Sequence, residues 1–132
     1  MVAIPQKVLD LMKKEGTVKA LVTSSKTGRP HAIAAGSIGA ASPEVMIFGE
    51  ILSKTSVKNL AENPKATFLI VNGMESYEIN CKVKAKLTSG PELDGMNKAI
   101  APMHLHANAL WLFDVCCVCE QGANPGAGKK LA

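Results

Sequence analysis

The stretch FGEILSKTSVKNLAENP, residues 48–64, decides how this chain folds, because it joins the end of a strand to a helix through a short polar loop. Val57, Leu60 and Ala61 recur at helical spacing, and the proline at the end of the stretch stops the helix. The hydroxyl groups and the ammonium group of residues 53–56 fall at the helix start. Unpaired N–H groups and the positive end of the helix dipole also lie there, so the pattern is typical of a phosphate site. The alternative interpretation is a Ser/Thr helix cap beside a solvated lysine.

Length and composition indicate one globular domain, residues 1–132, that ends in a Gly/Pro-rich tail over residues 121–132. Hydrophobic residues make up 47% of the chain and charged residues 20%, as in ordinary soluble proteins. No apolar run reaches the roughly 18 residues of a membrane span. The first residues, MVAIPQKVLDLMKKEG, have no signal-peptide core, so we expect a cytoplasmic protein without a membrane partner.

The charge pattern argues against a nucleic-acid partner. The net charge is only +4, and Arg29 is the single arginine among the 15 basic residues. Nucleic-acid readers cluster arginine with aromatic residues, and this chain has few of either.

The four cysteines, Cys81, Cys116, Cys117 and Cys119, do not form a CxxC ligand pair. A Cys-Cys-x-Cys run is first interpreted as small apolar strand residues, and a redox or metal role is the alternative. In the cytoplasm such thiols are kept reduced.

Periodicity and turn signals predict six strands and three helices. The helices are expected at residues 5–15, directly after the loop at residue 53, and between Pro91 and Pro102. The strands are expected at residues 17–24, 31–37, 44–49, 65–71, 77–87 and 110–120, with a loop at 40–43. Consecutive hairpins favour a mainly β fold, a small six-stranded antiparallel barrel of Greek-key type with helices outside.

Two of these strands carry an informative side-chain pattern. From Tyr77 to Leu87 apolar and polar residues alternate cleanly, which indicates a half-exposed strand. In the last strand the same period places Trp111, Phe113 and Val115 on one face together with Cys117 and Cys119.

The order of these elements resembles the FMN-binding split-barrel family, which includes pyridoxamine 5'-phosphate oxidases and short bacterial FMN-binding proteins. The resemblance rests on the hairpin TVKALVTSSKTGRPHAIAAGS, the strand VMIFGE, and the segment SKTSVKNLAENPKATFLIV. It continues through SGPELDGMNKAI and the last strand, and the tail NPGAGKKL is similar to that of some short members.

The resemblance implies an FMN cofactor in a groove between the two subunits of a homodimer. Lys54 and Thr55, with Ser53 nearby, match the phosphate-binding pair, and Phe48 and Gly49 would lie beside the ribityl chain. The small residues Ala34, Ala35, Gly36 and Ser37 match the segment whose backbone lies along the flavin ring. Trp111 is either a core or interface anchor or a stacking partner of the flavin.

The chain departs from true pyridoxamine 5'-phosphate oxidases, because its C-terminal part has no Arg-x-His pattern. That oxidase activity is therefore not expected, and no catalytic residue is identified. The expected function is that of an FMN-binding oxidoreductase or electron carrier. The alternatives are a non-catalytic binder of deazaflavin or haem on the same barrel, or a dimer without a cofactor. No metal site is expected, and the loop with His104 and His106 is expected to cover the flavin of the partner subunit.

Overall fold

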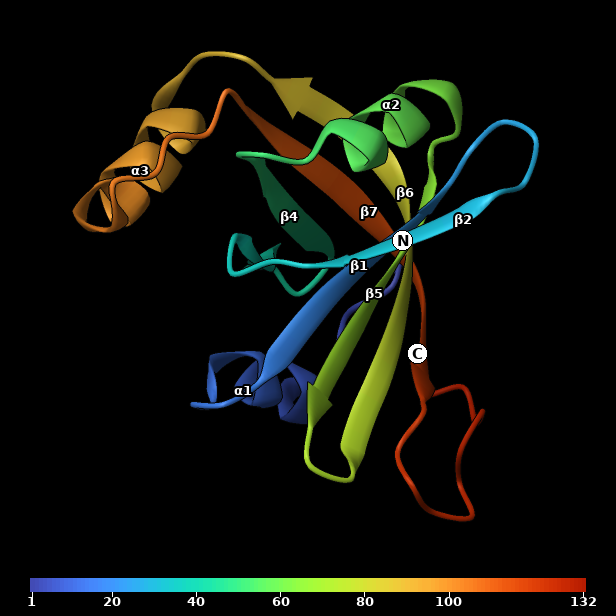
Figure 1. Ribbon diagram of the computed structural model, residues 1–132. Helices are drawn as coiled ribbons and strands as arrows, with labels where there is room; N and C mark the ends of the chain where they lie inside the picture. Colours follow the sequence, from blue (N-terminus) through green and yellow to red (C-terminus); the bar gives the residue numbers. More distant parts are fainter.

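The structure, a computed structural model of residues 1–132, consists of seven strands in one curled sheet and three α-helices (Figure 1). In chain order the elements are α1 (Gln6–Lys13), β1 (Val18–Ser24), β2 (Pro30–Ala34), β3 (Ile38–Ser42), β4 (Val45–Glu50), α2 (Lys54–Glu62), β5 (Lys65–Asn72), β6 (Glu75–Leu87), α3 (Pro91–Ile100) and β7 (Ala109–Glu120). The predicted mainly β fold with flanking helices is confirmed. None of the helices has the length and apolar character that crossing a bilayer requires.

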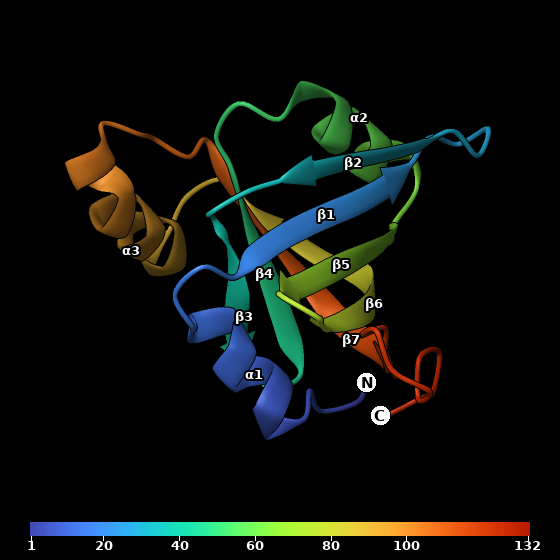
Figure 2. The same ribbon diagram turned by 60° about the horizontal axis from the view of Figure 1, so that its bottom comes forward.

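The sheet curls because its two edges are consecutive in the sequence. Neighbouring strands are antiparallel and follow the order β2-β1-β5-β6-β7-β4-β3. Only residues 35–37 separate β2 from β3, so this connection must join the opposite edges of the sheet (Figure 2). Lys19 on β1 spans the remaining gap, where its Nζ donates a hydrogen bond to the Ile38 carbonyl oxygen at 2.7 Å. The result is a half-barrel rather than an open sheet.

The seventh strand corrects the sequence-based prediction. We expected a second strand through Ser37 and a loop at residues 40–43, but β2 ends at Ala34 and β3 follows at Ile38–Ser42. The residues of β3 are mostly small and show no alternation, so they carry no strand signal of their own. Pairing with β4, in which Ile38 faces Phe48, imposes the extended conformation.

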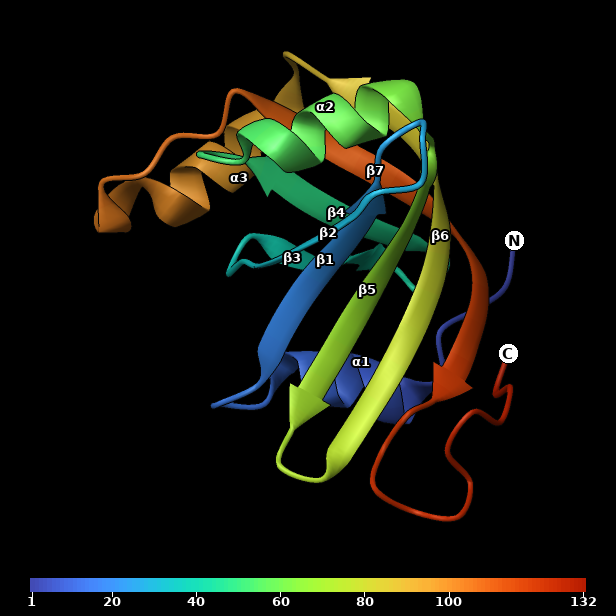
Figure 3. The same cartoon turned by 45° about the vertical axis from the view of Figure 1, so that its right-hand side comes forward.

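The core lies inside the curl and is closed from below by α1 (Figure 3). Phe48, Phe68 and Phe113 are fully buried, and the rings of Phe68 and Phe113 meet edge to face at 5.0 Å. A second, smaller cluster packs Leu93 and Ile100 of α3 against the start of β7. Helix α3 therefore lies to one side of the barrel (Figure 1).

A β-bulge changes which residues of β7 face the core. The alternation predicted for β6 is confirmed, with Tyr77, Ile79 and Cys81 buried. In β7, however, Asn80 pairs with Cys117 while Cys81 pairs with Val115, so Cys116 is an extra residue. The prediction that Cys117 and Cys119 share a face with Trp111, Phe113 and Val115 is therefore wrong, and Val118 is buried on that face instead.

The Gly/Pro-rich tail folds back along β7 (Figure 3). Leu131 N donates to the Val118 carbonyl oxygen at 2.7 Å, and Val118 N donates to the Ala132 carbonyl oxygen at 3.0 Å. The tail thus bonds to the edge of β7 after Asp114, where β4 no longer pairs with this strand.

Candidate functional site

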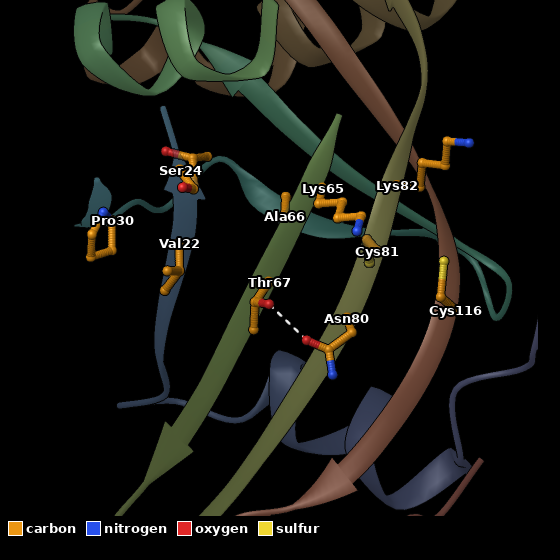
Figure 4. A pocket seen from close by; sticks show the side chains of 11 residues that line it. Val22, Ser24, Pro30, Lys65, Ala66, Thr67, Asn80, Cys81, Lys82 and Cys116 are labelled. Atoms are coloured by element: carbon orange, nitrogen blue, oxygen red, sulfur yellow. Dashed lines mark hydrogen bonds between the residues drawn. The ribbon is translucent and has the colours of Figure 1, made fainter. Parts of the chain in front are cut away.

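A cavity of about 450 Å³ lies over β1, β5 and β6, on the face of these strands opposite the core (Figure 4). Thr67 Oγ1 donates to Asn80 Oδ1 at 2.7 Å on its floor. Lys65 and Lys82, which pair across β5 and β6, also line it. It contains none of the residues predicted to bind a cofactor.

A second cavity, here called the apolar cavity, has a volume of about 530 Å³ and is formed by the β2–β3 connection, the loop after β4, and the segment around α3's end. Six of the predicted cofactor residues line it: Ala34, Ala35, Gly36, Ser37, Gly49 and Ser53. Leu52, Met103 and Leu105, with exposed fractions of 86%, 60% and 38%, also line it. Large exposed apolar side chains gathered at a cavity mark a binding surface.

The floor of the apolar cavity is bare backbone held by hydrogen bonds. A Cβ added at Gly36 would meet no atom within 4 Å, so the backbone there is open to a ligand. A Cβ added at Gly49 would lie 3.1 Å from Ser37 Cβ, so a larger residue there would push the two segments apart by a few tenths of an ångström. Ser37 Oγ donates to the Gly49 carbonyl oxygen at 3.0 Å and fixes that approach.

A third cavity, here called the polar cavity, has a volume of about 620 Å³ and no hydrophobic residue in its lining. Thr55 is the one predicted cofactor residue in it. Lys26, Arg29 and Lys58 contribute three positive charges against the single carboxylate of Glu62. This excess of positive charge favours an anionic group.

The apolar and polar cavities share the same two elements. Strand β2 contributes Pro30 and His31 to the polar cavity and Ile33 and Ala34 to the apolar cavity. At the start of α2, Ser53 lines the apolar cavity and Thr55 the polar one. The start of α2 therefore borders both cavities. Ser53 is the N-cap residue of α2 but makes no side-chain cap hydrogen bond, and Lys54 beside it is exposed.

Helix α2 is held in this position by a buried polar contact. Asn59 Nδ2 donates to Thr23 Oγ1 at 3.1 Å, and both side chains are almost fully buried. This bond fixes the helix on β1, and with it the face of α2 that carries Thr55 and Lys58.

Three predicted cofactor residues lie outside both cavities. Lys54, the first residue of α2, is exposed, and Phe48 is fully buried in the core. Trp111 is 4% exposed, and its Nε1 donates to Glu50 Oε1 at 3.0 Å. Contacts of these residues with a cofactor stay predictions.

The structure adds candidates that sequence reasoning missed. Lys58 follows Thr55 by three residues, so helical spacing alone could have placed both on one face. Arg29 also lines the polar cavity, and nothing local in the sequence indicates that its turn faces α2. His104 and His106 are exposed and line neither cavity, whereas Leu105 between them lines the apolar one. No group of three or more potential metal ligands is assembled.

One further cation lies beside the cavity floor. Lys19 lines a small cavity of about 270 Å³ together with Ala34, Ala35 and Gly36. Burial lowers the pKa of its ammonium group, which has a carbonyl rather than a carboxylate as its partner.

Comparison with known proteins gives a family and a fold. The sequence matches the family described as Pyridoxamine 5'-phosphate oxidase over residues 4–115, and a comparison with curated protein sequences gives no match. HupZ of Group A Streptococcus superimposes with a TM-score of 0.81 at 17% identity, covering 95% of this chain and 99% of that one. An FMN-binding protein of Syntrophomonas wolfei gives 0.78 at 12% identity, covering 90% and 89%.

Proteins named for other cofactors share the fold. The haem storage protein HutZ of Vibrio cholerae gives a TM-score of 0.63 at 12% identity, covering 92% of this chain and 97% of that one. An F420 reductase gives 0.67 at 14% identity, covering 87% and 98%. These likenesses establish the fold alone. The sequence match over residues 4–115 shows that the chain belongs to the pyridoxamine 5'-phosphate oxidase family.

Proposed function

We propose that this protein is an FMN-binding flavoprotein that acts as an oxidoreductase or an electron carrier. The observation that carries the proposal is that the start of α2 borders both an apolar cavity with a bare backbone floor and a cationic polar cavity. FMN combines a flat ring with a phosphate group, so each cavity fits one end of the same molecule.

Different residues would bind the phosphate and the ring of FMN. Thr55, Lys58 and Arg29 would hold the phosphate, with the unpaired first-turn amides of α2 as further donors. The backbone at Ala34–Gly36 would support the ring, and Met103 and Leu105 would exclude water from it. Bound FMN supplies hydride or single-electron transfer. Because no titratable side chain lines the apolar cavity, the chain offers orientation and polarity there rather than a general acid.

We further propose a homodimer, because an apolar rim of this kind is usually covered. Leu52, Met103 and Leu105 are exposed together at the rim of the apolar cavity. A second copy placed over this rim would complete the ring site.

The test is a paired titration of the purified protein with FMN and riboflavin, followed by flavin fluorescence. We expect one FMN per chain and at least tenfold weaker binding of riboflavin, which lacks the phosphate. Lys58→Met should weaken FMN binding by about 1.5–3 kcal/mol and leave riboflavin binding unchanged. Lys84→Met, an exposed lysine on β6 outside both cavities, is the matched control. Equal affinity for FMN and riboflavin would show that the polar cavity does not bind the phosphate.

Deazaflavin and haem are the alternative occupants, and the same titration distinguishes them. Histidine is a common axial ligand of haem iron; neither His104 nor His106 lines the apolar cavity, and His31 lines the polar one. A Soret band shifted from that of free haem, in a protein that does not bind FMN, would support the haem alternative. Selective uptake of F420 would support the deazaflavin one.

A further inference from the structure

Neither the hydrophobic core nor the proposed cofactor site includes the cysteines at the end of β7. Cys117 and Cys119 are two residues apart on a strand, so their side chains lie on the same face. Their sulfur atoms are 3.6 Å apart, and both residues are partly exposed. The bulge at Cys116 produces this arrangement, because it turns the pair away from the core and gives Val118 the buried position.

We propose that Cys117 and Cys119 form a dithiol site that low-molecular-weight disulfides, such as oxidised glutathione, convert to an intrastrand disulfide. One cysteine attacks the glutathione disulfide, forms a mixed disulfide and releases the first glutathione thiol. The second cysteine attacks the protein-bound sulfur and releases the second glutathione thiol. Two protein S–H bonds are replaced by one S–S bond, and glutathione takes up the two electrons and two protons.

Strand geometry allows this bond and makes it labile. Two residues of extended chain span about 6.6 Å, near the long end of the Cα separations that disulfides bridge. The backbone cannot contract, because β6 holds one edge of β7 and the tail holds the other, with Leu131 N bonded to the Val118 carbonyl oxygen at 2.7 Å. A bridge under such tension is more easily reduced than a structural one.

The surroundings of Cys81 and Cys116 prevent these two cysteines from forming the intrastrand disulfide. Cys81 is 4% exposed, and burial raises the pKa of its thiol. Cys116 is exposed, and its Sγ contacts the Asp114 carbonyl oxygen rather than another thiol. We therefore expect a stable mixed disulfide at Cys116 and ring closure only at Cys117 and Cys119. Burial, and then the hydrogen bond with Cys117, raise the pKa of the Cys119 thiol, so the reaction is best run at mildly alkaline pH.

The experiment starts from the full chain carrying Cys116→Ser, which leaves the pair as the only accessible thiols. After exposure to oxidised glutathione, intact mass should show the loss of two hydrogens with no retained glutathione. Excess dithiothreitol should restore the original mass. The same chain with Cys117→Ser as well should show no such loss and should retain glutathione at Cys119. A glutathione adduct that persists in the Cys116→Ser protein, or an unchanged mass, would overturn the proposal.

A second measurement tests the pairing without any oxidation. Phenylarsine oxide bridges two adjacent thiols and releases one water molecule. One arsenical per chain should stay bound to the Cys116→Ser protein in the presence of a competing monothiol. It should wash off the variant that also lacks Cys117. Equal release from both proteins would show that the two sulfur atoms do not act as a pair.

Discussion

The substitution Gly36→Leu tests the proposed cofactor site without disturbing the fold. Gly36 lines the apolar cavity, its φ lies outside the left-handed region, and an added Cβ would meet no atom within 4 Å. A leucine side chain there would occupy the space above the floor on which we propose the flavin ring rests. A ring lying on that floor buries on the order of 100 Å², worth about 2.5 kcal/mol at 25 cal/mol per Å². The expected loss of FMN affinity is therefore roughly 70-fold.

The stability of the folded chain should hardly change, because a Cβ at position 36 would meet no atom within 4 Å. We expect the free energy of unfolding in urea to stay within about 0.5 kcal/mol of the wild type. Gly95→Leu is the matched control, since Gly95 is exposed on α3, is also free of contacts within 4 Å, and lines neither cavity. Wild-type FMN affinity in folded Gly36→Leu protein would refute the assignment of this floor to the ring.

Three further predictions address the charges and buried groups around the site. Lys54→Ala should weaken FMN binding less than about tenfold in calorimetric titration, because Lys54 lines neither cavity whereas Lys58 and Arg29 line the polar one; a loss of about 1.5–3 kcal/mol, as for a charge-assisted hydrogen bond, would place Lys54 at the phosphate. Trp111→Phe removes the hydrogen bond to Glu50 and should cost about 1 kcal/mol of stability in urea unfolding. Its FMN affinity should stay within about twofold because Trp111 lines neither cavity, whereas a larger loss would put the indole at the flavin. Burial raises the pKa of Cys81 above its ordinary value of 9.0, so the folded chain keeps this thiol protonated while the unfolded chain ionises it. This stabilisation is complete below pH 9 and is lost as the pH rises further. Urea midpoints of Cys81→Ala should consequently fall less steeply than those of the wild type above this pH, and equal slopes would contradict the assignment.

The parts of the fold that were predicted correctly are those whose pattern is local. The alternation from Tyr77 to Leu87 indicates a strand with one solvent-exposed face, and β6 includes that range. The helix of residues 54–62 is framed by its apolar spacing and by Pro64, and α2 ends at Glu62. In both cases neighbouring residues contain the whole signal.

The errors arise where distant segments decide the conformation. Strand β3 exists because β4 pairs with it, and its small residues have no preference that reveals this. The bulge at Cys116 depends on the register between β6 and β7, which a single strand cannot report. For the same reason Arg29 was missed, because only the packing of the β1–β2 turn toward α2 places it in the polar cavity.

The residues that close the sheet are also the residues that build the cavity floor. Ala35 N donates to the Lys19 carbonyl oxygen at 3.0 Å, and Gly49 N donates to the Ser37 carbonyl oxygen at 3.3 Å, so both ends of the connection are tied to neighbouring strands. Gly36 lies between these anchors with open space above it. The curl of the sheet therefore holds a stretch of backbone rigid and leaves its surface uncovered, which is what a flat ring requires. Because the anchors carry the fold and Gly36 does not, binding can be removed at this position while the barrel stays intact.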